Sequence, residues 1–254
     1  MNKKYLFFIL LFISGCTNIV EKYYSGMSIQ ESNAKFGNNK NETPMLVKIT
    51  NGEEIYKIAA NNYEVIGESN FNTSGVSEDK MLSFGKKINA EIITYFYQYT
   101  HTVDSTYTVT TPNFSTTNTT VSNSYGNILG YIDSNTTSYS TQYIPYSTRM
   151  YDYHIAFWRK YPIKPRLGLK IANLTQQEQA KIQSYKGVCV IVVINDSPAY
   201  KNDILPYDII TKINNKEISN TKDFHEYLHK FNGNSIKLEI FRNNKLINKI
   251  IKLD

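Results

Sequence analysis

One segment of the chain has the residue spacing of a hydrolytic metal site. From His225 to His229 the sequence is HEYLH, and on a helix this spacing places two imidazoles on one face, with Glu226 as a candidate general base. A catalytic zinc needs a third protein ligand, yet no histidine follows His229, and Glu239 falls in an expected strand. We therefore expect no metal and no cofactor, and keep a zinc metallopeptidase as the minor alternative. Phe224, Leu228 and Phe231, in and around this segment, have the spacing of the core-facing side of a helix.

Other catalytic patterns are weaker. The stretch 67–71, GESNF, lacks the second glycine of a G-x-S-x-G nucleophile turn, and the sequence has no glycine-rich phosphate loop. We expect this protein not to be an enzyme.

The last third of the chain has the pattern of a small α+β domain. Residues 187–194, GVCVIVVI, form a nearly unbroken β-branched run that favours a strand buried on both faces. A short helix is expected to begin at Ser197, and Asp208 opens an apolar strand that ends in an Asn-rich turn at 214–215. A helix over 221–231 and a closing hairpin over 236–253 complete the domain.

This order of elements, over residues 163–253, resembles the PDZ domain of HtrA-type bacterial proteases. The likeness is carried by residues 197–218, SPAYKNDILPYDIITKINNKEI, against the family pattern SPA-x-x-A-G-L-x-x-G-D-x-I-x-x-I-N-G-x-x-I. Two positions depart from it: Asn202-Asp203 replaces Ala-Gly, and Tyr207 replaces the glycine before the aspartate. A tyrosine is strained there if its φ is positive. The resemblance covers recognition alone, since no protease domain precedes it.

The resemblance implies a mode of binding. An extended peptide would add as a strand along residues 167–171, with its C-terminal carboxylate on the backbone N–H groups of Leu167, Gly168 and Leu169. Its last side chain would enter an apolar pocket, and His225 or His229 would either bond a peptide side chain or simply be solvated. The implied peptide-binding residues are Arg166, Leu167, Gly168, Leu169, Ile171, Phe224, His225 and Leu228.

The N-terminus resembles the leader of bacterial lipoproteins. Two lysines in 1–4 precede an apolar core over 5–13 and then Ile13-Ser14-Gly15-Cys16, which is similar to a lipobox. The resemblance implies that Cys16 is lipidated and anchors the chain. The resemblance also favours the outer membrane, because Thr17 is not the aspartate associated with inner-membrane retention. We expect the chain to face the periplasm, although the sequence does not choose the leaflet. An ordinary signal peptide in which Cys16 follows Gly15 by chance is the alternative.

Four segments follow from these patterns. They are a signal peptide (1–15), a lipidated cysteine with a flexible polar tether (16–43), a small α/β domain (44–160) and the PDZ-like domain (161–254). The second cysteine, Cys189, is expected to be a small buried apolar residue. The net charge of +6 is mild and scattered, which argues against a nucleic-acid partner, and the oligomeric state stays open.

The region 44–160 combines a βαβ-like unit with a long antiparallel hairpin. A strand over 63–71, a helix over 77–89 capped by Ser77 or Ser74, and a strand from Ala90 make the unit. Residues 100–148 alternate Ser, Thr and Asn with Tyr, which indicates exposed strands around a mobile tip at 110–123. The tyrosines could form an adhesive contact surface or an ordinary exposed sheet.

The leading hypothesis for the whole chain is an α+β adaptor or scaffold of the cell envelope, and an adhesive protein acting through the hairpin is the alternative.

Overall fold

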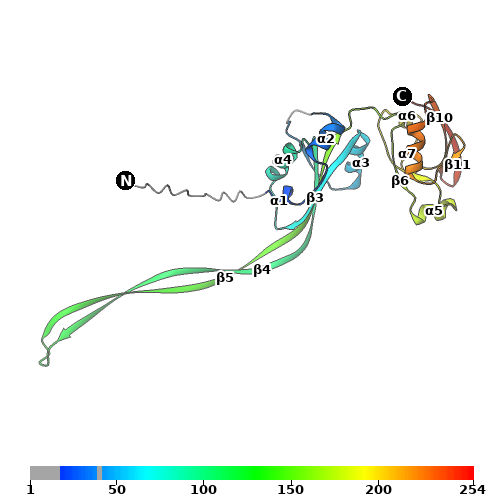
Figure 1. Ribbon diagram of the computed structural model, residues 1–254. Helices are drawn as coiled ribbons and strands as arrows, with labels where there is room; N and C mark the ends of the chain where they lie inside the picture. Colours follow the sequence, from blue (N-terminus) through cyan, green and yellow to red (C-terminus); the bar gives the residue numbers. More distant parts are fainter. Residues whose placement is uncertain (1–17, 39–41) are drawn as a thin grey trace, which may run out of the picture. The chain divides into compact units, whose positions relative to one another are not determined.

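A computed structural model describes residues 18–38 and 42–254 (Figure 1). The α+β class predicted from the sequence is confirmed: a five-stranded mixed sheet with helices comes first, and a six-stranded antiparallel sheet with helices follows. Cys16 and the rest of the leader lie outside the described residues. Within those residues, no helix is both long and apolar enough to span a membrane.

The first sheet has the strand order β1-β3-β5-β4-β2. Strand β2 is parallel to β4, and β1 is antiparallel to β3. The helix predicted over 77–89, between the strands now seen as β3 and β4, is α4, and Ser77 occupies its N-cap position. The elements of this domain are α1 (Ile19–Lys22), β1 (Tyr24–Gly26), α2 (Ile29–Phe36), β2 (Met45–Lys48), α3 (Gly52–Ala60), β3 (Tyr63–Thr73), α4 (Glu78–Lys87), β4 (Ile92–Ser122) and β5 (Ile128–Lys160).

The flexible tether predicted for 16–43 is wrong over residues 18–38. These residues form α1, β1 and α2, and β1 adds to the sheet beside β3. Two local signals make the helices: Asn18 caps α1, and Ser28 with Glu31 forms a capping box at the start of α2. Both helices bury apolar side chains, Val20 and Phe36, so they belong to the core of the domain.

One face of the first sheet contains a fully buried arginine. Arg159, on β5, donates from Nη1 to Ser32 Oγ at 3.1 Å and Asn33 Oδ1 at 2.9 Å, and from Nη2 to Gly37 O at 2.6 Å. These bonds join α2 to the sheet. Desolvation by burial lowers the pKa of the Arg159 guanidinium. The side chain is therefore a structural link between α2 and β5.

Strands β4 and β5 extend into a second compact unit, residues 72–75 and 97–152, which is a two-stranded ribbon whose strands coil about each other (Figure 1). The tip predicted at 110–123 is wrong, because β4 continues to Ser122 and the turn lies at 123–127. Asn123 closes that turn: its Oδ1 accepts from Tyr125 N and from Asn127 N, both at 3.0 Å. The Thr-rich strands have high β-propensity, so pairing continues to the turn.

The second sheet has the order β11-β10-β8-β7-β6, and β9 pairs with β8. Its main core is a cluster of aliphatic residues with Phe224, and a smaller one is formed by Leu174, Cys189 and Ile209. Cys189 is a free, buried thiol in β7, as its apolar setting predicted. The elements are β6 (Leu169–Asn173), α5 (Gln176–Ile182), β7 (Val188–Val193), α6 (Pro198–Lys201), β8 (Ile209–Ile213), β9 (Lys216–Glu217), α7 (Thr221–Lys230), β10 (Ser235–Arg242) and β11 (Lys245–Lys252).

Candidate peptide-binding site

Strand β6 is an edge strand with a helix beside it (Figure 1). In the described part of the chain β6 pairs with β7 alone, so its outer edge has no strand partner. Two links hold α7 along it. At the start of the helix, Thr221 N donates to Asn173 Oδ1 at 2.9 Å, and at its end Arg166, just before β6, donates to α7's last carbonyls. An open edge with an adjacent helix is the arrangement that accepts an added strand.

The loop before β6 is held by its carbonyl groups. Leu167 O accepts from Ala199 N and Gly168 O accepts from Ile194 N, both at 2.9 Å. The backbone N–H groups of Leu167 and Gly168 have no acceptor anywhere in the described ranges. Both residues are buried, so two unpaired donors here are unusual and mark a place where a ligand oxygen fits.

Only glycine fits at position 168. Its φ is +86°, a conformation that side chains rarely adopt. A Cβ placed on Gly168 would lie 2.1 Å from the Cβ of Ser197. Ser197 is itself fixed, because its Oγ caps α6 by accepting from Tyr200 N at 3.2 Å. The close approach of loop and helix therefore sets the position of the two unpaired N–H groups.

Arg166 is engaged by the end of α7. Its guanidinium donates to Phe231 O, to Gly233 O at 2.7 Å and to Leu228 O at 3.4 Å, and lies 5.8 Å from the centroid of the Phe231 ring. A cation at a helix C-terminus is stabilising, because the last carbonyls there lack partners within the helix. Arg166 therefore fixes the end of α7, a contact that the sequence did not reveal, and its role toward a carboxylate stays a prediction.

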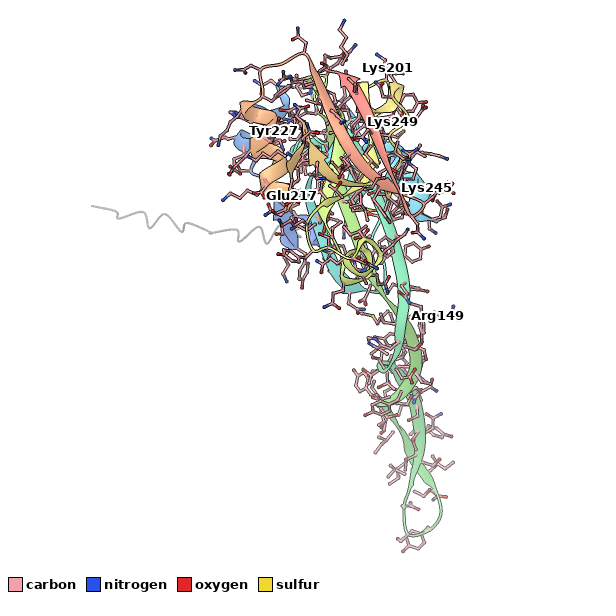
Figure 2. All side chains as sticks on the ribbon, turned by 90° about the vertical axis from the view of Figure 1, so that its right-hand side faces the viewer. Arg149, Lys201, Glu217, Tyr227, Lys245 and Lys249 are labelled. Carbon is pink, nitrogen blue, oxygen red and sulfur yellow. The ribbon has the colours of Figure 1, made fainter. Side chains whose placement is uncertain are left out.

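The apolar residues predicted for the pocket come from both elements. Leu169 and Ile171 on β6 and Leu228 on α7 are half-buried and pack on the same core cluster. Phe224 is part of that core cluster and almost completely buried, and its contact with a peptide stays a prediction. The structure thus brings the predicted β6 and α7 residues onto one apolar cluster. Tyr227 and Phe231 pack on the same cluster and also line a separate hollow of about 500 Å³ with residues of β9 (Figure 2 labels Tyr227 and Glu217).

The histidines of the HEYLH segment are exposed on α7. Glu226 lies between two lysines of the same helix, with carboxylate-to-Nζ distances of 4.0 Å to Lys222 and 3.7 Å to Lys230. No cluster of three ligating side chains occurs in residues 18–38 or 42–254. His225 lies next to the buried Phe224, with ring centroids 5.9 Å apart, on the helix that borders β6.

A buried ion pair supports the turn before β8. Asp208 is 1% exposed and forms a bidentate pair with Arg242 at 2.6 Å for both contacts, while Leu205 N donates to Asp208 Oδ2 at 2.9 Å. The hydrogen bonds to Asp208 raise the pKa of Arg242. Tyr207 adopts φ +69° with its side chain 79% exposed, so this departure from the family pattern is accommodated in a strained backbone conformation.

Comparison with known proteins agrees with this geometry. A family model described as a PDZ domain matches residues 165–253. A probable periplasmic serine endoprotease, DegP-like, from Hahella chejuensis is 33% identical over 94 residues, which cover 37% of this chain and 20% of that protein. The mitochondrial serine protease HTRA2 of Drosophila erecta is 34% identical over 82 residues, covering 29% and 19%. Residues 165–253 are therefore a PDZ domain that resembles those of HtrA proteases.

These matches cover only part of the chain, from 29% to 39% of it. The chain spans about a fifth of the length of the curated relatives it matches. Among solved structures, the HtrA3 PDZ domain bound to a phage-derived ligand has 22% identity and a TM-score of 0.31, covering 35% of this chain and 83% of that one. An HtrA-type protease with a decapeptide has 20% identity and a TM-score of 0.33, covering 39% and 36%.

Proposed function

We propose that this chain is a non-enzymatic adaptor of the bacterial cell envelope that binds peptide or protein C-termini through its PDZ domain. The peptide adds as a strand to the open edge of β6 and lies between β6 and α7. Main-chain bonds give affinity, and the apolar cluster selects the last side chain. Leu169, Ile171 and Leu228 contact that side chain, and His225 borders the peptide further along α7.

The observation that carries the proposal is the pair of unpaired N–H groups at the start of β6. Leu167 and Gly168 have no acceptor for these donors within the described residues, and a C-terminal carboxylate supplies two. Hydrogen bonds to a charged group contribute about 1.5–3 kcal/mol each. An internal peptide segment has no such anion, so this geometry favours free C-termini.

The anchoring part of the proposal is supported by sequence alone. A lipid on Cys16 would attach the chain to the outer membrane, facing the periplasm, and each acyl CH₂ buried contributes about 0.8 kcal/mol. Labelled palmitate supplied to producing cells should enter the wild-type chain and not a Cys16→Ser variant. Equal labelling of both would remove the anchor from the proposal.

The location of the site is tested by a matched pair of variants. Leu228→Lys puts a charge on the apolar cluster beside β6, whereas Leu246→Lys makes the same change on β11, at the opposite end of the sheet. Binding of a panel of fluorescent C-terminal peptides is measured by anisotropy. We expect the first variant to weaken binding at least about tenfold, or about 1.4 kcal/mol, and the second to match wild type. Equal behaviour of the two variants would place the site elsewhere.

A second candidate function rests on the ribbon of residues 97–152. No residue in that range is buried, and many are tyrosines, which give large contact areas at low entropic cost. If the ribbon is an adhesive surface, deleting residues 106–143 abolishes partner binding while the Leu228→Lys change has no effect. The opposite pattern supports the PDZ site.

A further inference from the structure

The ribbon has two open edges. Strand β4 pairs with β2 only as far as Tyr95, and β3 ends at Thr73, so beyond these points β4 and β5 have only each other among the described strands. Strand β4 is 31 residues long and β5 is 33 residues long, whereas strands in globular proteins usually have 3–10 residues. An isolated two-stranded hairpin is marginally stable in water, and its edges carry unpaired N–H and C=O groups. The ribbon is therefore built to receive another strand.

The charge pattern restricts what that strand can be. Residues 105–148 contain one charged side chain, Asp133, in a protein that is 20% charged. Edge strands are usually protected by lysines, and this ribbon has none between 105 and 148. A strongly charged partner finds no complement here. The edge therefore favours a nearly neutral strand. A second copy of the same ribbon supplies one, because two such strands meet with little like-charge repulsion.

The prolines distinguish the two edges. Pro112 lies within β4, in the middle of the ribbon, while β5 has no proline from Ile128 to Ile144. Proline cannot donate to a sheet ladder, so the longer unbroken row of donors lies on β5. This stretch, 128–144, is the "β5 edge segment".

The most exposed large apolar side chains of the two ribbon strands lie on one face, while less exposed ones, such as Ile128 and Ile132 at 57%, lie on the other. The side-chain bonds Thr110–Thr141 (3.2 Å) and Thr116–Asn135 (2.9 Å) place even-numbered β4 residues on the same face as odd-numbered β5 residues. That face carries five large apolar residues, each 68–79% exposed: Phe114, Leu129, Tyr131, Tyr139 and Tyr143. Four of the five lie in the β5 edge segment. Two such segments, paired edge to edge, would place these residues side by side.

We propose that two copies of this chain associate through the β5 edge segment, antiparallel about a two-fold axis, to form a four-stranded sheet. Closed two-fold symmetry is the commonest arrangement in homo-oligomers, and it makes the same segment serve both copies. Aromatic cross-strand pairs on the common face add to the main-chain bonds. The peptide sites of the two PDZ domains would then act as a bivalent pair.

The test uses the full chain in a nonionic detergent, with mass measured by sedimentation velocity over a concentration series. Tyr131→Lys with Tyr139→Lys puts two lysines four residues on either side of Asn135, close to the middle of the segment, so that with the two-fold axis at Asn135 each faces a lysine of the other copy. Thr108→Lys with Thr120→Lys is the control, with the same charge on the same face but on β4. Wild type and control should dimerise equally, and the tyrosine double variant should dimerise about tenfold or more weakly.

Hydrogen exchange at two protein concentrations gives an independent measure. We expect protection of residues 128–144 to rise with concentration while that of 113–122 stays constant. A wild-type chain that is monomeric throughout, or a control pair that dissociates as readily as the tyrosine variant, overturns the proposal. Binding of the ribbon to phosphatidylcholine vesicles without any dimer overturns it as well, and makes a lipid surface the occupant.

Discussion

The contact between Gly168 and Ser197 gives a prediction whose magnitude follows from the structure. Gly168→Ala places a Cβ 2.1 Å from the Cβ of Ser197 at φ +86°. The left-handed backbone costs an alanine about 1–2 kcal/mol, and overpacking costs about 1–3 kcal/mol more. Ser197→Gly removes the obstructing atoms and, as an N-cap change, costs only a few tenths of a kcal/mol. The double variant should therefore regain the stability lost to overpacking, and should still lack the stability lost to the left-handed backbone.

The measurement is a double-mutant cycle. The free energy of unfolding of the PDZ domain is read from hydrogen exchange of the β7 amides, because β7 is central in the sheet. A coupling of about 1–3 kcal/mol between the two positions is expected. Additive effects, or a harmless Gly168→Ala, would contradict the reasoning. Because any side chain at 168 disturbs the fold, loss of peptide binding in a Gly168 variant is not by itself proof of carboxylate capture.

Four further predictions concern other parts of the chain. Arg242→Met leaves Asp208 buried without its cation and should destabilise the PDZ domain by about 3–5 kcal/mol in the same exchange assay, whereas Lys245→Met on the neighbouring strand should not. Burial raises the pKa of Cys189 to about 12, so a thiol reagent should leave it unmodified at pH 8 in the folded protein and modify it after denaturation. Arg159→Met should release α2 and lower its amide protection, since three bonds to Ser32, Asn33 and Gly37 are lost, and unchanged protection would contradict the structural link. The backbone bond from Ser28 lowers the pKa of Glu31 below its usual value, so its stabilisation of α2 is present above the unfolded-state pKa and is lost as the pH falls through the folded-state pKa. Amide exchange of α2 at pH 3 and pH 6, corrected for intrinsic rates, should show the difference.

Local conformational signals were predictable from the sequence. Gly168 has a positive φ, which glycine adopts readily, and the predicted Asn-rich turn at 214–215 has positive φ at both residues. The β-branched run at 188–193 forms a strand with both neighbours, β6 and β8. These features depend on residue type and short spacing, which a single sequence displays.

Long-range partners were not predictable. The bond from Arg166 to the end of α7 joins residues more than 60 positions apart in the sequence. Arg242 and Asp208, which form an ion pair, are 34 positions apart. Nothing in the local pattern specifies which carbonyl or carboxylate a given arginine will find. The error over residues 18–38 has a different cause: two very short helices present little apolar periodicity, and the only clear signal was the Ser28–Glu31 capping box.

The central claim is that the free N–H groups of Leu167 and Gly168 capture a C-terminal carboxylate. The most direct measurement is the dissociation constant of one binding peptide with a free and with an amidated C-terminus, by calorimetry on the same preparation. The account predicts that amidation weakens binding at least about tenfold, and that Leu228→Lys, but not Leu246→Lys, weakens the free form likewise. Equal affinity of the free and amidated peptides would contradict it.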